Sequence, residues 1–548
     1  MKKLEVDKPE TLFQFILKTY VNPAIQLIKE FISWNLSQKR VLENKLKQKD
    51  REIGELNKHI NKLTQSLNAG REFLEAARNS VEEDLEAERI AIGIPSLLST
   101  EETAIEIPPS SLQRLNDSKI KLQQIEEAGV KPTSKGYFEL GLIAYYTGKY
   151  ADAENLWKSA LTTEPLHFHV HYNLGVFYTK KGLLDEAVSE YKKATESNPN
   201  HAEAHYHLGI AYNKKGMLDD AINEFKATVK IDSKHFTAYF KLGDAYKARG
   251  MLKEALNAYK ESASGGALNP NLVDVYNNLG TVCKIMGMID EAVDAYKKAL
   301  EINPSFAEVH NNLGVAYDDT GRTEEAVSEY IKAVQLNPGY AEAHNNLGAA
   351  YALSGRLEGA IAEYLKAIEI NRNYVEAYNN LGVAYDNKGM IEDAVNQYMK
   401  ALEINPDYAE AHNNMGIACV EKGLLDDAIL EYKKAVLINP DYAEAYYNLA
   451  VVYSKKKMFN EAIDGYKRVL KIDPTDAAAH HNLSIAYRHK GMIDEAISEC
   501  KKAVEIKPDL AEAHYNLGVA YQEKGIPILA RQELAIYKKL INQAPTGI

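Results

Sequence analysis

Apolar and small residues return along most of the chain with a fixed period of 34 residues. The stretch "YAEAHNNLGAAY", which begins at Tyr340, comes back as "YVEAYNNLGVAY" at Tyr374 and as "YAEAHNNMGIAC" at Tyr408. If the Ala after this Tyr is position 1, Leu stands at position 7, Gly at 8 and 15, Tyr at 11 and 24, Ala at 20 and 27, and Pro at 32. Twelve such repeats fit between Ser134 and Ala544, with a three-residue insertion around Ser264.

Each repeat is predicted to form two helices. Positions 1–14 are amphipathic, and the Gly at position 15 supplies the left-handed residue that commonly ends a helix. The second helix is expected to begin at an Asp near position 18, such as Asp290, acting as its cap, and to end before the Pro of the next turn. One such hairpin cannot bury its apolar face alone, so neighbouring repeats must stack. The pattern therefore predicts an all-α chain.

The spacing of Leu, Gly, Tyr, Ala and Pro resembles the tetratricopeptide repeat, or TPR. The resemblance covers about three quarters of the chain. It implies a right-handed α-solenoid, a TPR superhelix of about twelve repeats, in which the first helices line a concave groove. The insertion divides the array into residues 134–272, with repeats 1 to 4, and residues 273–544, with repeats 5 to 12.

Position 6 is predicted to face that groove, and it is Asn in nine of the twelve repeats. An Asn amide has donor and acceptor groups, so it can bond both the C=O and the N–H of an extended peptide. In the alternative interpretation, these amides bond a neighbouring helix or a water molecule, and duplication of the repeat copied them. The array also resembles that of the O-GlcNAc transferase family, in which an asparagine ladder grips the partner's main chain. The predicted peptide-binding residues are Asn173, Asn278, Asn312, Asn346, Asn380, Asn414, Asn448, Asn482 and Asn516, with Val315, Val383, Ile417 and Val451 of position 9 beside them.

Three other recurrent residue types have structural explanations. Glu410 lies three residues after Asp407, which is the spacing of a helix-capping box, although an acidic rail for a basic peptide is an alternative. Position 4 is His in seven repeats and Tyr in others, which indicates aromatic packing. Equivalent residues of adjacent repeats are about 10 Å apart, too far to share a Zn²⁺ ion with bonds of about 2.0–2.1 Å. The cysteines occupy Tyr positions and are expected to be buried. We therefore expect no metal and no cofactor.

The first 133 residues do not follow the repeat. Residues 1–35 contain an apolar segment, Thr11–Trp34, expected to dock onto the protein or a partner, with a membrane surface as the alternative. Residues 36–92 carry a heptad pattern that predicts a coiled coil and a parallel homodimer, against the alternative of an intramolecular hairpin. Residues 93–133 are expected to be a linker and a lead-in helix. The a positions are Leu46, Ile53, Ile60, Leu67, Leu74 and Val81, and the d positions are Leu42, Lys49, Leu56, Leu63, Gly70 and Ala77.

Composition narrows the classes of function. The formal net charge of −12 argues against nucleic acid as a partner. Three cysteines fit a reducing compartment. There is no apolar run of about 18 residues and no signal-peptide core, so a cytoplasmic location is expected. No phosphate-binding Gly loop, Gly-x-Ser-x-Gly or His-Glu-x-x-His motif is present, so the chain is not expected to be an enzyme.

Together these patterns predict a non-enzymatic scaffold for protein–protein interaction. Its groove would hold an extended segment of a partner, and a coiled-coil dimer would raise the avidity. Two alternatives remain. One is a substrate-targeting subunit for a separate glycosyltransferase, by resemblance to O-GlcNAc transferase, and the other is an assembly factor at a membrane surface.

Overall fold

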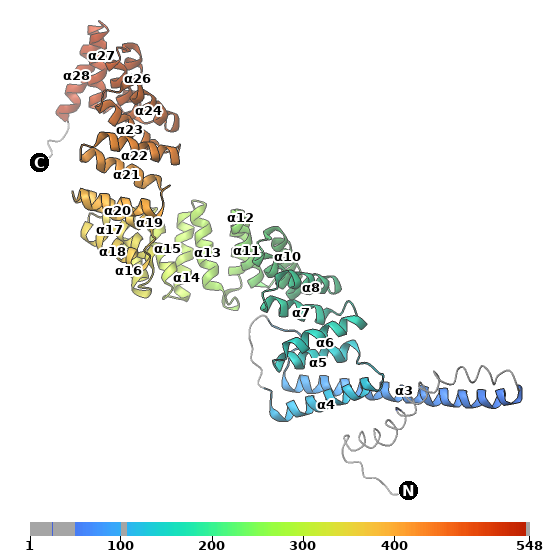
Figure 1. Ribbon diagram of the computed structural model, residues 1–548. Helices are drawn as coiled ribbons and strands as arrows, with labels where there is room; N and C mark the ends of the chain where they lie inside the picture. Colours follow the sequence, from blue (N-terminus) through green and yellow to red (C-terminus); the bar gives the residue numbers. More distant parts are fainter. Residues whose placement is uncertain (1–24, 26–49, 100–106, 544–548) are drawn as a thin grey trace. The chain divides into compact units, whose positions relative to one another are not determined.

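The computed structural model describes residue 25, residues 50–99 and residues 107–543, and every regular element in these ranges is helical (Figure 1). The chain forms two compact units, Met1–Val275 and Tyr276–Ile548. The first unit contains α3 (Asp50–Ile92), α4 (Pro109–Glu127), α5 (Ser134–Tyr146), α6 (Tyr150–Thr163), α7 (Phe168–Lys180), α8 (Leu184–Ser197), α9 (Ala202–Lys214), α10 (Leu218–Ile231), α11 (Phe236–Ala248), α12 (Leu252–Ala263) and a 3-10 turn, Gly266–Leu268.

Helix α13 (Leu272–Ile285) crosses the boundary between the units and is followed by the regular hairpins of the second unit. These are α14 (Ile289–Ile302), α15 (Ala307–Asp318), α16 (Thr323–Leu336), α17 (Ala341–Leu353), α18 (Leu357–Ile370), α19 (Val375–Asn387), α20 (Ile391–Ile404), α21 (Ala409–Glu421), α22 (Leu425–Ile438), α23 (Ala443–Lys455), α24 (Phe459–Ile472), α25 (Ala477–His489), α26 (Ile493–Ile506), α27 (Ala511–Glu523) and α28 (Pro527–Gln543). From α5 onward, odd numbers mark the first helix of a repeat and even numbers mark the second. The predicted all-α solenoid of helical hairpins is confirmed.

The C-terminal ends of the first helices agree with the prediction from the repeat pattern, whereas the N-terminal cap of the second helices differs from it. Gly355, at position 15, has φ of 74° and follows the end of α17, as predicted. In repeat 10 the same position is Lys457, which has φ of 60°. The prediction that Asp290 caps the second helix is wrong, because Met288 is the N-cap and makes no side-chain cap bond. Asp290 lies in the first turn, where the helix dipole favours its charge.

The two helices of a repeat meet at position 8, where a Gly lets an aromatic ring approach the backbone. A Cβ added to Gly348 would lie 2.7 Å from the ring of Tyr364, which is buried in the core. Repeat 10 has Ala450 at this position and accommodates it with Gly465 opposite, where an added Cβ would come within 2.8 Å of the Ala450 Cβ. Close helix contact is thus kept even where the pattern changes.

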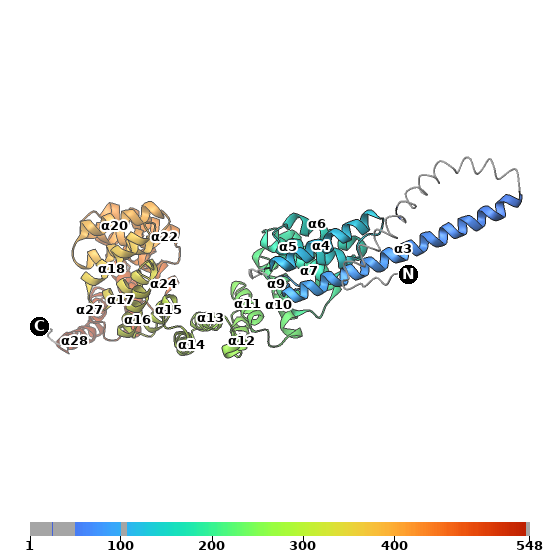
Figure 2. The same cartoon turned by 90° about the horizontal axis from the view of Figure 1, so that it is seen from below.

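Helix α3 is divided between a buried and an exposed half. In its second half Leu74, Val81 and Leu85 are buried in one cluster with residues of α4 and α5, and Figure 2 shows α3 extending well past α4. In its first half the predicted seam residues Ile60 and Leu63 are each 40% exposed. Intramolecular packing, the alternative to the predicted coiled coil, therefore accounts for the second half of the heptad pattern. The coiled coil stays a prediction for the first half.

The predicted segment 11–34 and the heptad residues Leu42, Leu46 and Lys49 lie outside the described residues, apart from Ile25. Ile25 packs against the same cluster of α3, α4 and α5. Among the described helices, none combines the length and apolarity that crossing a membrane requires.

Candidate peptide-binding surface

In repeats 6 to 10, the amides at position 6 tie each repeat to the repeat before it. Asn346 donates from Nδ2 to the Oδ1 of Asn311, 3.0 Å away, and Asn380 donates in the same way to Asn345 at 3.1 Å. The same bond joins Asn312 to Asn277 (2.9 Å), Asn414 to Asn379 (2.9 Å) and Asn448 to Asn413 (3.1 Å). One group of each amide therefore bonds a neighbouring first helix, as the alternative interpretation proposed.

The last two repeats keep this link with different acceptors. Asn482 donates to the hydroxyl of Tyr447 at 2.8 Å, and the Asn516 amide contacts the ring of His481 at 3.5 Å. All these acceptors stand at position 5 of the preceding repeat. Sequence reasoning missed position 5, although the doublet "NN" in five consecutive repeats, beginning with Asn277 and Asn278, was a signal for it.

The Glu residues at position 2 form further hydrogen bonds between repeats. The Nδ2 of Asn277 donates to Glu308 of the next repeat at 2.9 Å, and that of Asn413 reaches Glu444 at 3.4 Å. The capping-box interpretation of position 2 is wrong, because Tyr408 is the N-cap of α21 and makes no side-chain cap bond. The Glu side chains instead hold the buried amides of position 5.

The carbonyl oxygens of position 6 remain accessible. Within residues 107–543, the Oδ1 atoms of Asn346, Asn380 and Asn414 accept no hydrogen bond, and none of them is a buried atom. At position 9, Val315, Ile417 and Val451 are partly buried and Val383 is exposed. We call the partly exposed amides of Asn312, Asn346, Asn380, Asn414, Asn448, Asn482 and Asn516 the position-6 row. This row offers one acceptor per repeat beside a partly apolar strip.

Asn173 differs from the other predicted residues, because the chain itself covers it. It is fully buried, its Nδ2 donates to the backbone oxygen of Ser96 at 2.9 Å, and its Oδ1 accepts from the backbone N–H of Leu98 at 2.8 Å. In repeat 1, position 6 is Glu139, which forms a buried ion pair with Arg89 at 2.6 Å. Position 6 of the first two repeats thus faces the chain's own residues 89–98, and Asn173 is not open to a partner.

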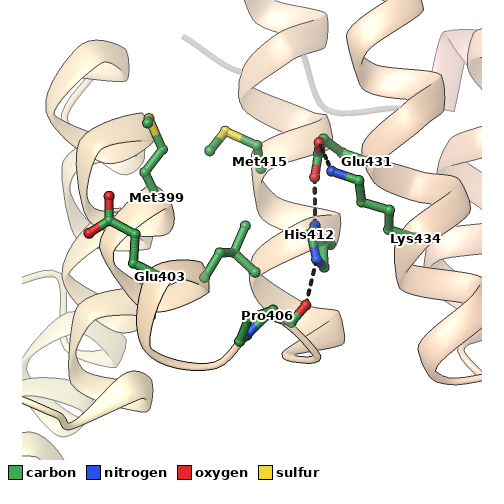
Figure 3. Close-up of a pocket in the computed structure, with 8 residues that line it drawn as sticks. Met399, Glu403, Pro406, His412, Met415, Glu431 and Lys434 are labelled. Atoms are coloured by element: carbon green, nitrogen blue, oxygen red, sulfur yellow. Dashed lines mark hydrogen bonds and ion pairs between the residues drawn. The ribbon is translucent and has the colours of Figure 1, made fainter.

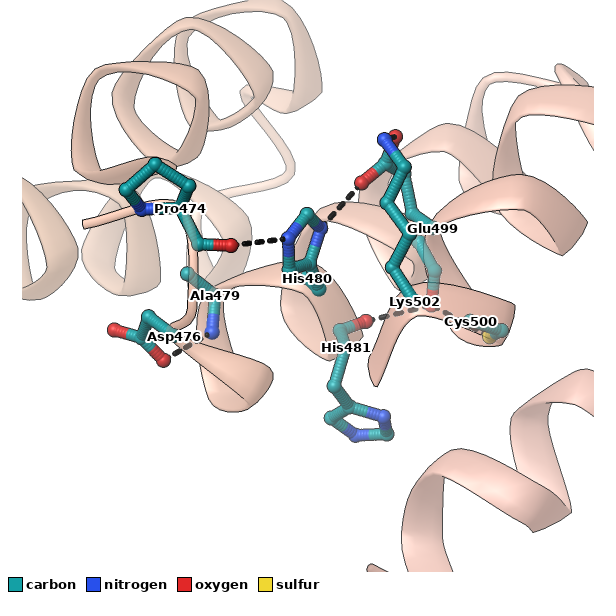
Figure 4. A network of polar contacts seen from close by, with 9 residues as sticks. Pro474, Asp476, Ala479, His480, His481, Glu499, Cys500 and Lys502 are labelled. Carbon is teal, nitrogen blue, oxygen red and sulfur yellow. Dashed lines mark hydrogen bonds and ion pairs between the residues drawn. The ribbon is translucent and has the colours of Figure 1, made fainter. Parts of the chain in front are cut away.

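The His residues of position 4 are polar clamps rather than simple aromatic packing. In Figure 4, the Nε2 of His480 meets the backbone oxygen of Pro474 at 3.2 Å, and Nδ1 meets the Glu499 carboxylate at 2.5 Å. A carbonyl oxygen only accepts, so Nε2 carries a hydrogen and the His–Glu contact needs a further proton. The same three-part contact occurs at His171, His205, His310, His344, His412 and His514.

Other reactive groups are enclosed by the fold. The cysteines are buried, and burial raises the pKa of Cys500 to about 11. Its Sγ lies 2.9 Å from the hydroxyl of Ser484. In the part of the chain that the structure describes, no three His, Cys, Asp or Glu residues are arranged to hold a metal ion.

Two family models match the sequence. A model named TPR repeat matches residues 177–216, 211–250, 280–321 and 319–355. A model for the C-terminal domain of cilia and flagella-associated protein 70, a TPR model by its label, matches residues 339–539. A search of curated proteins finds no match.

Several solved structures are similar to parts of this chain. YrrB, described as a TPR protein with an unusual peptide-binding site, shares 27% identity over 34% of this chain and 95% of its own, with a TM-score of 0.29. A MamA structure shares 34% identity over 30% of this chain and 97% of its own, with a TM-score of 0.28. Cut9–Hcn1 of the APC/C shares 18% identity over 74% of this chain and 94% of its own, with a TM-score of 0.41.

These TM-scores are low, so the assignment depends on the sequence models and on the observed hairpins. The two models together cover most of the array from residue 177 to residue 539. The 34-residue helical hairpin, with its Gly–Tyr contact and its turn glycine, recurs through both units. The chain is therefore a tetratricopeptide-repeat protein.

Proposed function

We propose that this protein is a scaffold whose position-6 row binds an extended segment of a partner protein through the segment's main chain. In Asn346, Asn380 and Asn414, one N–H of the amide is already used between repeats, so the carbonyl oxygen and the second N–H are the groups left for a ligand. The oxygen would accept from a peptide N–H, and the second N–H would donate to a peptide C=O. Such contacts read no side chain, and specificity would come from the apolar strip at position 9.

The spacing of the row suits an extended chain. Adjacent helices pack about 8–10 Å apart, and an extended chain advances about 3.3–3.6 Å per residue. One amide would therefore meet about every third residue of the ligand. The bond between positions 5 and 6 also fixes the orientation of each amide before binding, which lowers the entropy lost on association.

The observation that carries the proposal is the contact of Asn173 with residues 96–98. There an amide at position 6 holds a backbone C=O and a backbone N–H at once, at 2.9 and 2.8 Å. That segment bends at Ser96 and Leu97, so it supports the chemistry of the contact rather than the extended shape of a ligand.

A matched pair of triple variants tests the proposal. The first variant changes Asn346, Asn380 and Asn414 to Ala, which removes three hydrogen bonds between repeats together with three accessible oxygens. The second variant changes Asn311, Asn345 and Asn379 to Ala. It breaks the same three bonds by removing their buried acceptors, and it leaves the accessible oxygens in place. The second variant is expected to lose at least as much stability as the first, because its Asn residues are buried and Asn311 also contacts Glu342. The first variant should lose much more partner capture from native lysate per folded molecule, because it alone lacks the oxygens. Equal capture by both variants would reject the proposal.

A dimer through the first half of α3 is a second element of the proposal. The exposed seam residues Ile60 and Leu63 lie on a helix that has no covering neighbour among the described residues at this point. A second copy of α3 would bury both. Changing Ile60 and Leu63 to Glu should convert a dimer to a monomer in analytical ultracentrifugation, and changing the already exposed Glu72 to Gln should not. A monomeric wild type would remove the dimer from the account.

The other two roles remain predictions without a supporting contact. A glycosyltransferase-targeting role predicts co-purification with such an enzyme. An assembly role at membranes predicts flotation with liposomes that is lost after deletion of residues 1–34.

A further inference from the structure

The outward faces of the second helices form another surface, away from the position-6 row. Positions 18, 22, 25 and 29 lie on one stripe of a helix, because they are separated by four, three and four residues. Position 25 is Lys in eight of the twelve repeats: Lys158, Lys192, Lys226, Lys260, Lys297, Lys433, Lys467 and Lys501. Lys is therefore the usual residue at position 25, and repeats without it can be compared with those that have it.

In five of these eight repeats, the Lys at position 25 lies over an aromatic ring of the next repeat. The Nζ of Lys192 lies 5.6 Å from the ring centre of Tyr212, and that of Lys467 lies 5.7 Å from the ring centre of Tyr487. These contacts place a charged, hydrated group on the outer face and give the position a structural role.

Three consecutive repeats, 6 to 8, replace this Lys with Ile331, Leu365 and Met399. Leu365 and Met399 are 48% and 49% exposed. The next second helix, α22, adds Leu430 at 54% and Leu437 at 82% exposure, at positions where the other repeats carry polar residues or Ala. We call Leu365, Met399, Leu430 and Leu437 the outer apolar patch. Single exposed apolar residues need no explanation, but a group on adjacent helices marks an interaction site.

A hollow of about 470 Å³ adjoins this patch at Met399 (Figure 3). Met399 and Leu402 of α20 form one wall, Met415 of α21 lines the hollow, and the His412–Glu431 clamp bounds the opposite side. Met415 stands at position 7, where the other eleven repeats have Leu. The volume lies in the range of binding pockets, about 300–1,000 Å³, and methionine walls adapt to the shape of an incoming side chain.

The charge of the helices around the patch indicates which kind of partner can bind there. Helices α18 and α20 each carry three acidic residues and one basic residue, and α22 carries three acidic residues and two basic ones. The exposed Glu369 and Glu403 stand one turn beyond Leu365 and Met399, and no ion pair of theirs occurs within residues 107–543. A partner therefore needs apolar side chains flanked by Lys or Arg. An anionic lipid surface does not fit, because the acidic rim would repel it.

We propose that the outer apolar patch binds an amphipathic helix of a partner protein, with basic residues beside its apolar face. The helix lies in the groove between neighbouring second helices, and one large apolar side chain enters the hollow beside Met399 and Met415. Helices recognised in grooves present anchors at spacings of three, four and seven residues. This surface is separate from the position-6 row, so a two-sided scaffold could hold two partners at once.

The test uses the full-length protein and a labelled synthetic amphipathic helix of Leu and Lys, with binding followed by fluorescence anisotropy. A second peptide carries Glu in place of Lys. The patch variant is Leu365→Gln with Met399→Gln, which keeps the net charge. The control variant is Ile302→Gln with Ile506→Gln, two exposed apolar residues of the second helices outside the patch.

We expect the Lys peptide to bind the wild type and the control variant equally, the patch variant at least about tenfold more weakly, and the Glu peptide poorly. A tenfold loss corresponds to about 1.4 kcal/mol. Equal binding of both peptides, or no loss in the patch variant, would overturn the proposal. Self-association that disappears only in the patch variant would also overturn it, because a second copy would then cover the patch.

Discussion

Repeat 2 and repeats 6 to 9 use the same helix position in contrasting ways. In repeat 2, Asn173 is fully buried, and both groups of its amide hold the backbone of residues 96–98. In repeats 6 to 9, Asn346 and its equivalents use one N–H between repeats and keep an accessible oxygen. The contrast shows that an amide at position 6 holds main-chain groups in repeat 2, and our proposal extends this contact to the open amides of repeats 6 to 9. Whether it is open depends on what the rest of the chain places over it.

The covering of the first repeats depends on a buried charge pair. Arg89 bonds the Glu139 carboxylate at 2.6 Å and the backbone oxygen of Ile94 at 2.7 Å, so it fixes the segment that Asn173 holds. Burial raises the pKa of Glu139, and the nearby Arg89 counteracts that rise. Repeats 6 to 9 have neutral amides at this position and need no such pairing.

The largest expected effect comes from removing this pair. Arg89→Ala leaves Glu139 buried without its partner and should lower the free energy of unfolding of the first unit by about 3–5 kcal/mol. Chemical denaturation measures it. The loss should shrink at acidic pH, where Glu139 becomes protonated. Arg114→Ala removes a partly exposed pair with Glu88 between α3 and α4 and should cause a much smaller loss, because solvent screens that pair. An equal loss in both variants would contradict the role given to burial.

The next largest loss of stability is expected from the buried Asn173, and it can be compared directly with the loss from the partly exposed Asn380. Asn173→Ala leaves the backbone groups of Ser96 and Leu98 without their partner inside the protein, at a cost of about 1–3 kcal/mol. Asn380→Ala breaks one hydrogen bond at a partly exposed site, at a cost of about 0.5–1.5 kcal/mol. Urea unfolding of both variants measures the difference. If Asn380→Ala costs more, the order of burial assigned to the two positions is wrong.

A smaller effect is expected in the second unit alone. Lys457 occupies the left-handed turn position that is Gly in the other repeats, and a side chain there costs about 1–2 kcal/mol. Lys457→Gly should raise the stability of the second unit by up to that amount. Hydrogen exchange should show slower opening around α23 and α24, with unchanged exchange in α5 to α8. Slower exchange in the first unit as well would show that the two units do not unfold independently.

The smallest effect concerns the His–Glu clamps. The carboxylate of Glu224 bonds to His205 and raises its pKa, so the stability from His205 is present below its usual pKa and is lost as pH rises through the raised one. Burial opposes ionisation of Glu329, but bonds from His310 and Lys332 outweigh it and lower its pKa. The stability from Glu329 is therefore present above its usual pKa and is lost as pH falls through the lowered one. Both clamps should be strongest between these limits.

His205→Gln tests the upper limit. The variant should lose more stability near pH 6 than near pH 9, by less than about 1 kcal/mol because the pair is partly exposed. Urea unfolding at the two pH values provides the comparison. A larger loss near pH 9 would show that His205 is neutral in the folded protein.

The sequence was sufficient for the helices and insufficient for the contacts between them. The period of 34 residues located both helices of each repeat and the turn at Gly355, because each depends on residues close in sequence. The partners of Asn346 and His480 are 35 and 19 residues away, so finding them requires the packing of the hairpins. The heptad of α3 predicted an apolar seam but could not tell a second copy from α4, since either partner satisfies the same periodicity.

Binding of a main-chain-modified ligand tests the central claim most directly. A peptide from a captured partner segment would be compared with two kinds of derivative. The first kind is a set of peptides that are each N-methylated at every third backbone nitrogen, starting from a different residue, so that every register is covered. The second kind has its polar side chains exchanged for Ala. Our account predicts that one register of N-methylation abolishes binding while the Ala derivative still binds. Full binding by every N-methylated peptide, with loss in the Ala derivative, would contradict recognition through the backbone.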